Sequence, residues 1–257
     1  MHKDLLEKVK NLVMDVSAIA KHDGQLQIKE KGAKDYVTET DIKISEALIK
    51  DLPSLLEGSI VISEEGDQRN LDNRFCWIID PIDGTSNYIF GWREFCISVG
   101  LVENGTSVLG VVYSPGTGEM FYAAKDEGAF CNGERIHVSS DHCIGTTLVL
   151  AETNPYCDRM KNKYINIFKK VFMDCVDYRI TGSAALDCCY VACGRGGLLM
   201  AENLKPWDYA AGEIIIHEAG GMFTDWKGRK PDYIGNFEAL ASNGLIHNEA
   251  MNILKTF

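Results

Sequence analysis

The sequence lacks the features of several large protein classes. No apolar run approaches the roughly 20 residues that a membrane-spanning helix needs, and the first ten residues, MHKDLLEKVK, do not have the pattern of a signal peptide. Positive charge is scarce, because 26 lysines and arginines stand against 37 aspartates and glutamates, a net charge of −11. A basic surface supplies most of the affinity for a nucleic acid polymer. We therefore expect a cytoplasmic protein without a membrane or nucleic acid partner.

Two catalytic motifs and one cysteine pattern are also missing. The chain has neither the GxxxxGK[ST] loop of P-loop enzymes nor the GxSxG motif of serine hydrolases. Its nine cysteines are odd in number and include no CxxC pair, which favours free, buried thiols in a reducing compartment. Cys189 and Cys193 lie four apart on a predicted helix and could share a metal, but no histidine or further cysteine completes a tetrahedral set. Packing is the better interpretation of these two thiols.

The first part of the chain combines two helices with a run of strands. Apolar residues at helical spacing predict helices over 3–22 and 42–52, the second ending before Pro53. Apolar runs predict strands over 59–66 and 75–80, each with acidic residues at its end. Three further strands separated by Gly-rich and Pro-containing turns predict an antiparallel meander over 95–102, 107–113 and 119–124.

From about residue 140 strands alternate with helices. We expect strands at 147–151, 176–180 and 197–201, and helices at 158–172, 183–193 and 208–219, before a last helix within 244–257. Such alternation favours helices layered on a sheet. The predicted fold class is therefore α/β (α+β) with alternating layers of helices and sheets. We expect two closely packed subdomains, 1–140 with most of the metal ligands and 141–257 completing the active site.

Three acidic sites each follow an apolar stretch. They are Glu64 and Glu65 after IVIS, Asp80 and Asp83 after WII, and Asp208 after LKPW. Taken singly, each has an ordinary explanation: solvated loop charge, an Asx-type turn, and a helix N-cap. Taken together they do not, since carboxylates that converge near a core repel one another unless they are protonated or hold cations. Oxygen ligands without histidine or thiolate indicate a hard ion, most simply Mg²⁺.

Gly84 and Thr85 directly follow the second acidic site. Magnesium bound by carboxylates usually also binds substrate phosphate. A glycine lets the backbone approach an anion closely, and successive N–H groups at the start of a helix can hold one. The Thr85 hydroxyl could accept a hydrogen bond from an attacking water and so orient it. The pattern therefore predicts a phosphate site beside the metal site.

The motifs that carry these residues resemble those of the inositol monophosphatase family. They are WIIDPIDGTSN (77–87) and LKPWDYAAGEIIIHEAGG (204–221), with SEEG upstream and GSAALDCCYVACGR between them. The similarity extends from DYVTETD (35–41) to EAGGMFTDWKG (218–228). It implies a layered α/β fold, a homodimer, and Mg²⁺-dependent, lithium-sensitive hydrolysis of a small phosphate monoester.

The resemblance also implies a role for individual residues. Glu64, Asp80 and the Ile82 carbonyl would bind a first Mg²⁺; Asp80, Asp83 and Asp208 a second; Glu64 and Glu65 a weaker third; and Asp41 matches an acidic position near them. Glu64 and Thr85 would position the attacking water. Gly84 and Thr85 would contact phosphate, while Gly182, Ser183 and Ala184 would line the pocket for the rest of the substrate.

The substrate is the open point. Inositol-selective relatives carry a substrate-contacting glutamate seven residues before the aspartate that corresponds to Asp208; here that position is Ala201, and Glu202 follows it. Either Glu202 takes over the contact with the substrate, or Glu202 is a solvated charge and Ala201 leaves the substrate pocket roomier. Inositol monophosphate is the favoured substrate, with fructose 1,6-bisphosphate, histidinol phosphate and phosphoadenosine phosphate as alternatives from the same family. A non-catalytic binding protein on this scaffold is a further alternative, which the complete acidic set disfavours.

Overall fold

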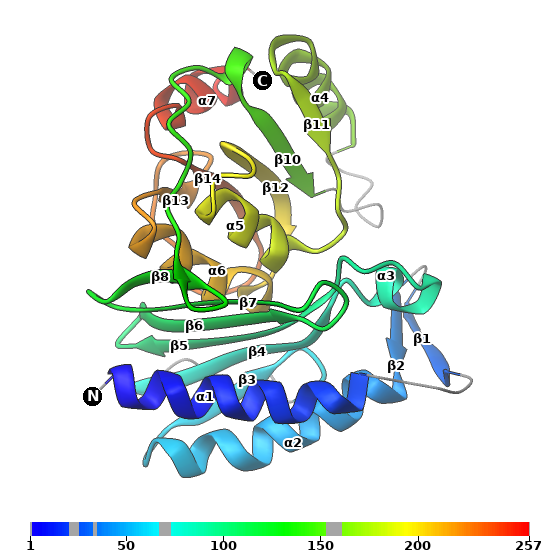
Figure 1. Ribbon diagram of the computed structural model, residues 1–257. Helices are drawn as coiled ribbons and strands as arrows, with labels where there is room; N and C mark the ends of the chain where they lie inside the picture. Colours follow the sequence, from blue (N-terminus) through cyan, green and yellow to red (C-terminus); the bar gives the residue numbers. More distant parts are fainter. Residues whose placement is uncertain (1, 21–25, 33–34, 67–72, 153–160, 257) are drawn as a thin grey trace.

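The protein is built from alternating layers of helices and sheets (Figure 1). The computed structural model describes residues 2–20, 26–32, 35–66, 73–152 and 161–256. Helices α1 (His2–Ser17) and α2 (Glu39–Leu55) cover one face of a seven-stranded sheet. Helices α5 (Ala184–Ala192) and α6 (Pro206–Glu218) lie between that sheet and a five-stranded one, and α4 (Lys161–Asp174) and α7 (His247–Leu254) flank the second sheet. The predicted layered α/β class is confirmed.

The larger sheet contains the predicted meander. Its strands, in spatial order, are β3 (Ile60–Ser63), β4 (Phe75–Asp83), β5 (Cys96–Glu103), β6 (Thr106–Ser114), β7 (Glu119–Ala124), β8 (Gly128–Cys131) and β9 (Glu134–Arg135). Strand β3 runs parallel to β4, and every later neighbour is antiparallel. Short turns join antiparallel strands directly, so consecutive strands lie side by side.

The smaller sheet holds the alternating part of the chain. Its spatial order is β11 (Asp177–Arg179), β10 (Leu148–Glu152), β12 (Leu198–Leu204), β14 (Phe237–Ser242) and β13 (Met222–Asp225). Strand β10 pairs in parallel with both β11 and β12, whereas β14 is antiparallel to its neighbours. The shorter elements are the hairpin β1 (Ile28–Gly32) and β2 (Asp35–Thr38), helix α3 (Thr85–Phe90) and the 3₁₀ turns Ala18–Ala20 and Ile144–Thr146.

Strand β4 is buried on both faces, which explains its continuous apolar sequence. Trp77 and Ile79 belong to the core against α1 and α2, while Cys76 and Ile78 belong to the core against α5 and α6. Successive strand residues point to opposite faces, so both layers of helices need apolar partners from this one strand. Strand β4 therefore lies inside the core, and one of its faces is directed at the layer between the two sheets.

Several predicted boundaries were wrong, and three of them concern the larger sheet's strand β4 and the two helices that cover that sheet. Helix α1 ends at Ser17 and continues only as a 3₁₀ turn, and α2 continues past Pro53 to Leu55. Proline removes one backbone donor, and in the last turn the fully buried Leu52 and the bond from Ser54 Oγ to the Asp51 carbonyl keep the helical path. The third boundary is the end of β4, which runs to Asp83 rather than Asp80. None of the described helices is long and apolar enough to cross a membrane.

Candidate metal centre

A β-bulge aims Asp80 and Asp83 at the same side of the larger sheet. In the ladder with β5, Asp80 pairs with Ser98 and Asp83 pairs with Cys96, so β4 contains one extra residue. In a regular strand, residues three apart point to opposite faces, and one inserted residue reverses that relation. Ile82 accordingly packs with the α1 and α2 core, and both aspartates face the α5 and α6 layer.

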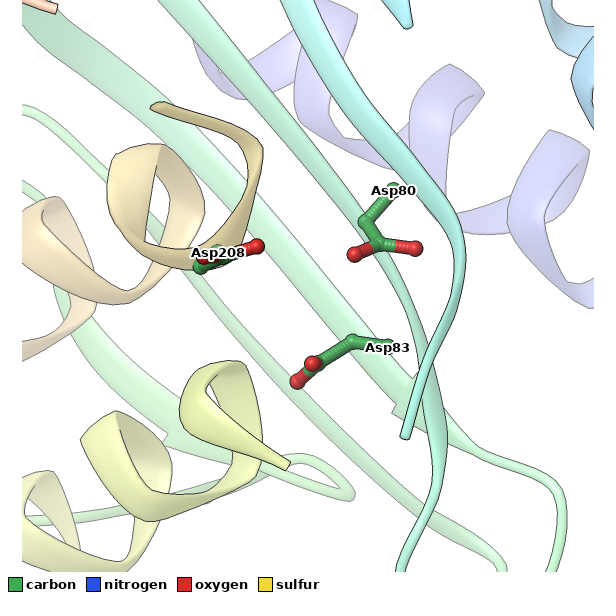
Figure 2. A group of neighbouring side chains, drawn as sticks. All are labelled: Asp80, Asp83 and Asp208. Atoms are coloured by element: carbon green, nitrogen blue, oxygen red, sulfur yellow. The ribbon is translucent and has the colours of Figure 1, made fainter. Parts of the chain in front are cut away.

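Asp208 completes the cluster from a different element. It lies in the first turn of α6, and its Oδ2 accepts a hydrogen bond of 2.7 Å from the Lys205 backbone N–H. Carboxylate oxygens of Asp80, Asp83 and Asp208 lie within 4.8 Å of one another. Figure 2 shows the three side chains converging from β4 and the start of α6. The predicted N-cap role was wrong: Lys205 is the N-cap, and Asp208 is the third residue of the helix, whose carboxylate bonds the N-cap N–H and also faces the other two aspartates.

Each oxygen of Asp83 has a distinct environment. Its Oδ2 accepts hydrogen bonds from Ser183 Oγ at 2.6 Å and from the Ala185 backbone N–H at 2.8 Å, at the start of α5. These bonds fix the rotation of the carboxylate, one oxygen of which lies within 4.8 Å of the ligand oxygens of Asp80 and Asp208. The start of α5 thus orients a candidate metal ligand that the sequence places 100 residues away.

The cluster carries more negative charge than its burial tolerates. Burial and repulsion from Glu64, Asp83 and Asp208 raise the pKa of Asp80 well above its ordinary value. Burial, with the Asp83 charge, does the same to the pKa of Asp208, and burial raises the pKa of Asp83 despite its hydrogen bonds. Buried carboxylates of this kind hold protons or a cation. The donor set consists of oxygens alone, which fits a hard divalent ion such as Mg²⁺.

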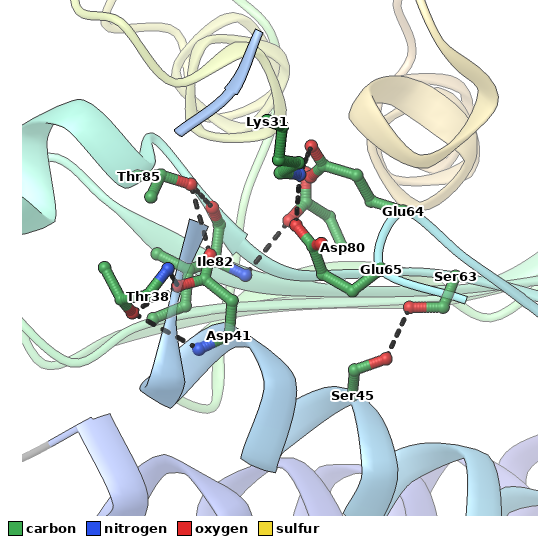
Figure 3. Close-up of polar contacts among 10 residues, drawn as sticks. All are labelled: Lys31, Thr38, Asp41, Ser45, Ser63, Glu64, Glu65, Asp80, Ile82 and Thr85. Carbon is green, nitrogen blue, oxygen red and sulfur yellow. Dashed lines mark hydrogen bonds and ion pairs between the residues drawn. The ribbon is translucent and has the colours of Figure 1, made fainter. Parts of the chain in front are cut away.

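Asp41 and Thr85 form a hydrogen-bonded pair beside the cluster (Figure 3). Asp41 is 1% exposed in the first turn of α2, where its Oδ2 accepts from the Thr38 backbone N–H in a capping box. Its Oδ1 accepts from the Thr85 hydroxyl at 3.2 Å, and the Ile82 carbonyl is a second acceptor for that hydroxyl at 3.0 Å. Since one hydroxyl has one proton, Thr85 keeps lone pairs that can accept a bond from water.

Gly84 occupies a position that strongly favours glycine. Its φ is +89°, and an added Cβ would lie 3.0 Å from the Glu94 carbonyl and 3.1 Å from the Gly182 carbonyl. L-residues rarely adopt such a φ, and the backbone atoms cannot yield. The turn between β4 and α3 therefore brings the Gly84 backbone against the segment that contains Gly182.

Glu64 and Glu65 follow β3, as predicted, and share a cation that the sequence did not indicate. Lys31 of the β1–β2 hairpin contacts both carboxylates, at 3.0 Å from Glu64 (Figure 3). Burial lowers the pKa of Lys31, but the two glutamates outweigh it and hold its pKa above the ordinary value. The Lys31 ammonium thus neutralises part of the charge at the position where the resemblance implies a third ion.

The structure joins two of the three predicted substrate-pocket residues to the metal cluster. Ser183 hydrogen-bonds Asp83, and Gly182 lies against Gly84, while Ala184 is the first residue of α5. Glu202 is not brought to the cluster, and at 5% exposed it is not a solvated charge either. It lines a separate pocket with Asn203, Asp225, Arg229, Asn236, Phe237 and Glu238. Ala201 packs in the core beside α5 and α6.

Sequence reasoning missed three side chains near the site. Lys31 is one, and Asn87 is another, since its amide donates to the Thr181 carbonyl at 2.8 Å and ties α3 to the 181–183 turn. Glu152 is the third, with its Oε1 accepting from the Gly182 N–H at 3.0 Å. Asn87 lies inside the motif WIIDPIDGTSN and Glu152 follows the predicted strand 147–151, so the sequence held a signal for both of them; it held none for Lys31.

The cysteines are less uniformly buried than predicted. All eight cysteines within the described residues are free; Cys157 lies outside them. Cys76, Cys96, Cys188 and Cys189 are buried, whereas Cys143 is exposed. Free thiols are confirmed for these eight, and burial for half of them.

Comparison with known proteins gives one consistent result. The chain matches the profile of the inositol monophosphatase family over residues 3–256. A Thermotoga maritima protein named fructose-1,6-bisphosphatase/inositol-1-monophosphatase is 39% identical, across 97% of this chain and 93% of that protein. The Escherichia coli (strain K12) protein named Nus factor SuhB is also 39% identical, across 79% and 76% of the two chains. A solved Thermotoga maritima IMPase structure superimposes with a TM-score of 0.89 at 34% identity, across 98% and 97%. By sequence, fold and the residues at its acidic centre, this chain belongs to the inositol monophosphatase family.

Proposed function

We propose that the protein is a Mg²⁺-dependent hydrolase of phosphate monoesters of small polyols or sugars. The observation that carries this proposal is the convergence of Asp80, Asp83 and Asp208, whose oxygens lie within 4.8 Å of one another; the first two are buried and Asp208 is half-buried. Three carboxylates with raised pKa values are costly to a fold unless they hold a cation. Their oxygen chemistry favours Mg²⁺ over softer metals.

The residues divide the work of hydrolysis among them. Asp80, Asp83, Asp208, Glu64 and the Ile82 carbonyl would hold two Mg²⁺ ions, with Glu65 near a third. Bound Mg²⁺ would lower the pKa of an attacking water and offset charge on the leaving oxygen. Thr85, oriented by Asp41 at 3.2 Å, accepts a hydrogen bond from that water, and Glu64 accepts a second. Gly84 and Thr85 present backbone N–H groups to the phosphate.

The alcohol part of the substrate would lie beyond the 182–184 segment. Inositol monophosphate is the favoured substrate and fructose 1,6-bisphosphate the next, in line with the double name of the Thermotoga maritima relative. Histidinol phosphate and phosphoadenosine phosphate are less favoured members of the same series. The metal cluster itself cannot discriminate among these substrates, because it binds only the phosphate group that they share.

A non-catalytic role is the second candidate. The relatives named Nus factor SuhB are the observation that favours it. A scaffold kept only for binding a partner would not need the metal cluster, yet Glu64, Asp80, Asp83, Thr85 and Asp208 are all present. Hydrolysis remains the better proposal.

We further propose that two copies form a homodimer through the edge of the smaller sheet. Strand β11 is an edge strand, and exposed apolar side chains gather near it: Met173 is 73%, Val176 65% and Ile180 53% exposed. An apolar edge of this kind commonly marks an interface. Light scattering after size-exclusion chromatography should give twice the chain mass, and Val176→Asp should shift it to one chain.

A phosphate-release assay tests the proposed activity. Purified protein should release phosphate from inositol 1-phosphate, fructose 1,6-bisphosphate or an aryl phosphate in Mg²⁺ and stop in EDTA. Restored turnover on adding Mg²⁺ back would exclude irreversible damage by the chelator. Full turnover in EDTA would contradict the metal-dependent mechanism, and no release from any ester would favour the binding role.

A further inference from the structure

Glu152 lies at the end of β10, on the sheet face that looks toward the candidate metal centre. The register pairs Glu152 with Ala201 of β12, and Leu150 with Leu199. Leu150, Leu199 and Ala201 belong to the core against α5 and α6. Since residues two apart in a strand share a face, Glu152 points to that side too. It is half-buried, at the carboxyl end of a parallel strand, where α/β sheets commonly bind ligands.

One turn of chain connects Glu152 to the metal centre. Its Oε1 accepts a hydrogen bond from the Gly182 N–H at 3.0 Å, and the next residue, Ser183, donates to Asp83 at 2.6 Å. Gly182 is exposed and has a φ of +80°, a conformation that suits glycine. Glu152 therefore lies beside the segment expected to contact the alcohol part of the substrate.

Asp187 pairs with Glu152 from the first turn of α5. It is fully buried, and its Oδ1 accepts from the Thr181 hydroxyl at 2.8 Å, whereas its Oδ2 has no donor among the described residues. The two carboxyl groups interact directly. Burial and the Asp83 charge raise the pKa of Glu152 to about 7, although its hydrogen bond with Asp187 acts in the opposite direction, and burial with the Glu152 charge raises the pKa of Asp187 well above its ordinary value. Two carboxyl groups in contact avoid repulsion by sharing a proton.

We propose that Glu152, supported by Asp187, is the residue that recognises the hydroxyl groups of the substrate's alcohol. This inference rests on the proposed phosphatase function and assigns the substrate-reading carboxylate to β10. A carboxyl pair with one proton can both accept from and donate to hydroxyls. Glu202 does not compete for the role, because its pocket contains none of the metal-cluster residues. Ala201 has no polar side chain, and its neighbour Glu152 is the described residue of β10 that brings a carboxylate to that face.

The test compares Glu152→Gln with a matched control, Glu202→Gln. Glutamine at 152 can still accept from the Gly182 N–H and can donate to Asp187, so the turn and the melting temperature should be preserved. For inositol 1-phosphate, kcat/KM should fall by at least about tenfold, mainly through KM, while an aryl phosphate without hydroxyls changes less than about twofold. Glu202→Gln should leave both esters within about twofold.

Asp187→Asn and Asp187→Ala test whether Asp187 acts through its hydrogen bond with Glu152 or only supports the local fold. Asparagine keeps an acceptor for Thr181 and supplies an N–H to Glu152 in place of the shared proton, so it should retain the preference for the polyol ester. Alanine should lose that preference.

Each other outcome overturns the proposal. If Glu152→Gln lowered kcat/KM equally for both esters, Glu152 would be only a structural support. If kcat/KM fell for neither ester, Glu152 would have no role in the reaction. A selective loss in Glu202→Gln would assign recognition to the other strand. If the unmodified protein hydrolyses the aryl ester but not the polyol, recognition of hydroxyls fails while the hydrolase proposal stands; hydrolysis of neither ester overturns both.

Discussion

The two sides of the candidate site are built in different ways. The metal side, defined by Asp41, Glu64, Asp80, Asp83 and Asp208, takes its ligands from the ends of strands and the first turns of helices. The alcohol side, defined by Glu152 and residues 181–187, depends on contacts between segments about 30 residues apart, such as Glu152 with Gly182. Short motifs therefore specify the metal ligands, and tertiary contacts specify the part of the site that binds the substrate's alcohol.

The largest expected effect comes from the metal side. Asp83→Asn keeps the shape of the side chain but removes a charge from the cluster. We expect kcat to fall by at least about a hundredfold with the fold intact, because the leaving oxygen loses its stabilising ion. Steady-state kinetics and circular dichroism measure both points.

Asp126→Asn is the matched control for that variant. Asp126 is exposed and has a φ of +65°, which asparagine also adopts readily. The activity of Asp126→Asn should equal that of the unmodified protein. An Asp83→Asn variant that retains half its activity would break the assignment of the metal side.

Stability should depend on pH and Mg²⁺ through the same carboxylates. In the metal-free protein, burial raises the pKa values of Asp80, Asp83, Asp208 and Glu64. Groups with raised folded-state pKa values contribute stability below their unfolded values, near pH 4, and lose it as the pH rises through the folded values. The melting temperature in EDTA should therefore fall as the pH rises above the unfolded-state values, about pH 4.

Mg²⁺ should reverse this loss. At about a hundred times its Kd it should raise the melting temperature by roughly 5–10 °C, and by more at high pH than at low pH. Differential scanning fluorimetry with and without the metal measures the difference. A gain that is independent of pH would show that these carboxylates are not the groups that Mg²⁺ deprotonates.

Lithium probes whether the metal side needs a divalent charge. Li⁺ also prefers oxygen ligands, but with one charge it stabilises a leaving oxygen less than Mg²⁺ does. Turnover at fixed Mg²⁺ should fall as lithium chloride is added, while sodium chloride at equal ionic strength leaves it unchanged. Indifference to lithium would indicate a second ion site shaped differently from the one the resemblance implies.

The smallest effect is expected at Lys31. Removing its charge with Lys31→Met should make Glu64 and Glu65 more available to a cation, lowering the Mg²⁺ concentration for half-maximal activity by roughly threefold. Lys43→Met is the control, since Lys43 pairs with Glu39 on the exposed face of α2. A rise in the Mg²⁺ requirement would mean that Lys31 assists the site rather than competing for it.

The contrast between the two sides also explains what the sequence could predict. Glu64, Asp80, Asp83 and Asp208 were identifiable because each follows an apolar stretch within a short motif. The bulge that aligns Asp80 with Asp83 was not, since it is defined by the partner strand β5 rather than by residues 80–83 themselves. Likewise Lys31 and Glu152 reach the site from the hairpin and from β10, and only the folded chain reveals their partners.

The location of a bound metal tests the central claim most directly. Crystals of the protein grown with Mn²⁺, which accepts the same oxygen ligands as Mg²⁺, would reveal the ion by its anomalous scattering. The account predicts a peak coordinated by Asp80, Asp83 and Asp208, and its disappearance in Asp83→Asn crystals grown in the same way. A fully occupied ion elsewhere, with these three carboxylates unliganded, would contradict it.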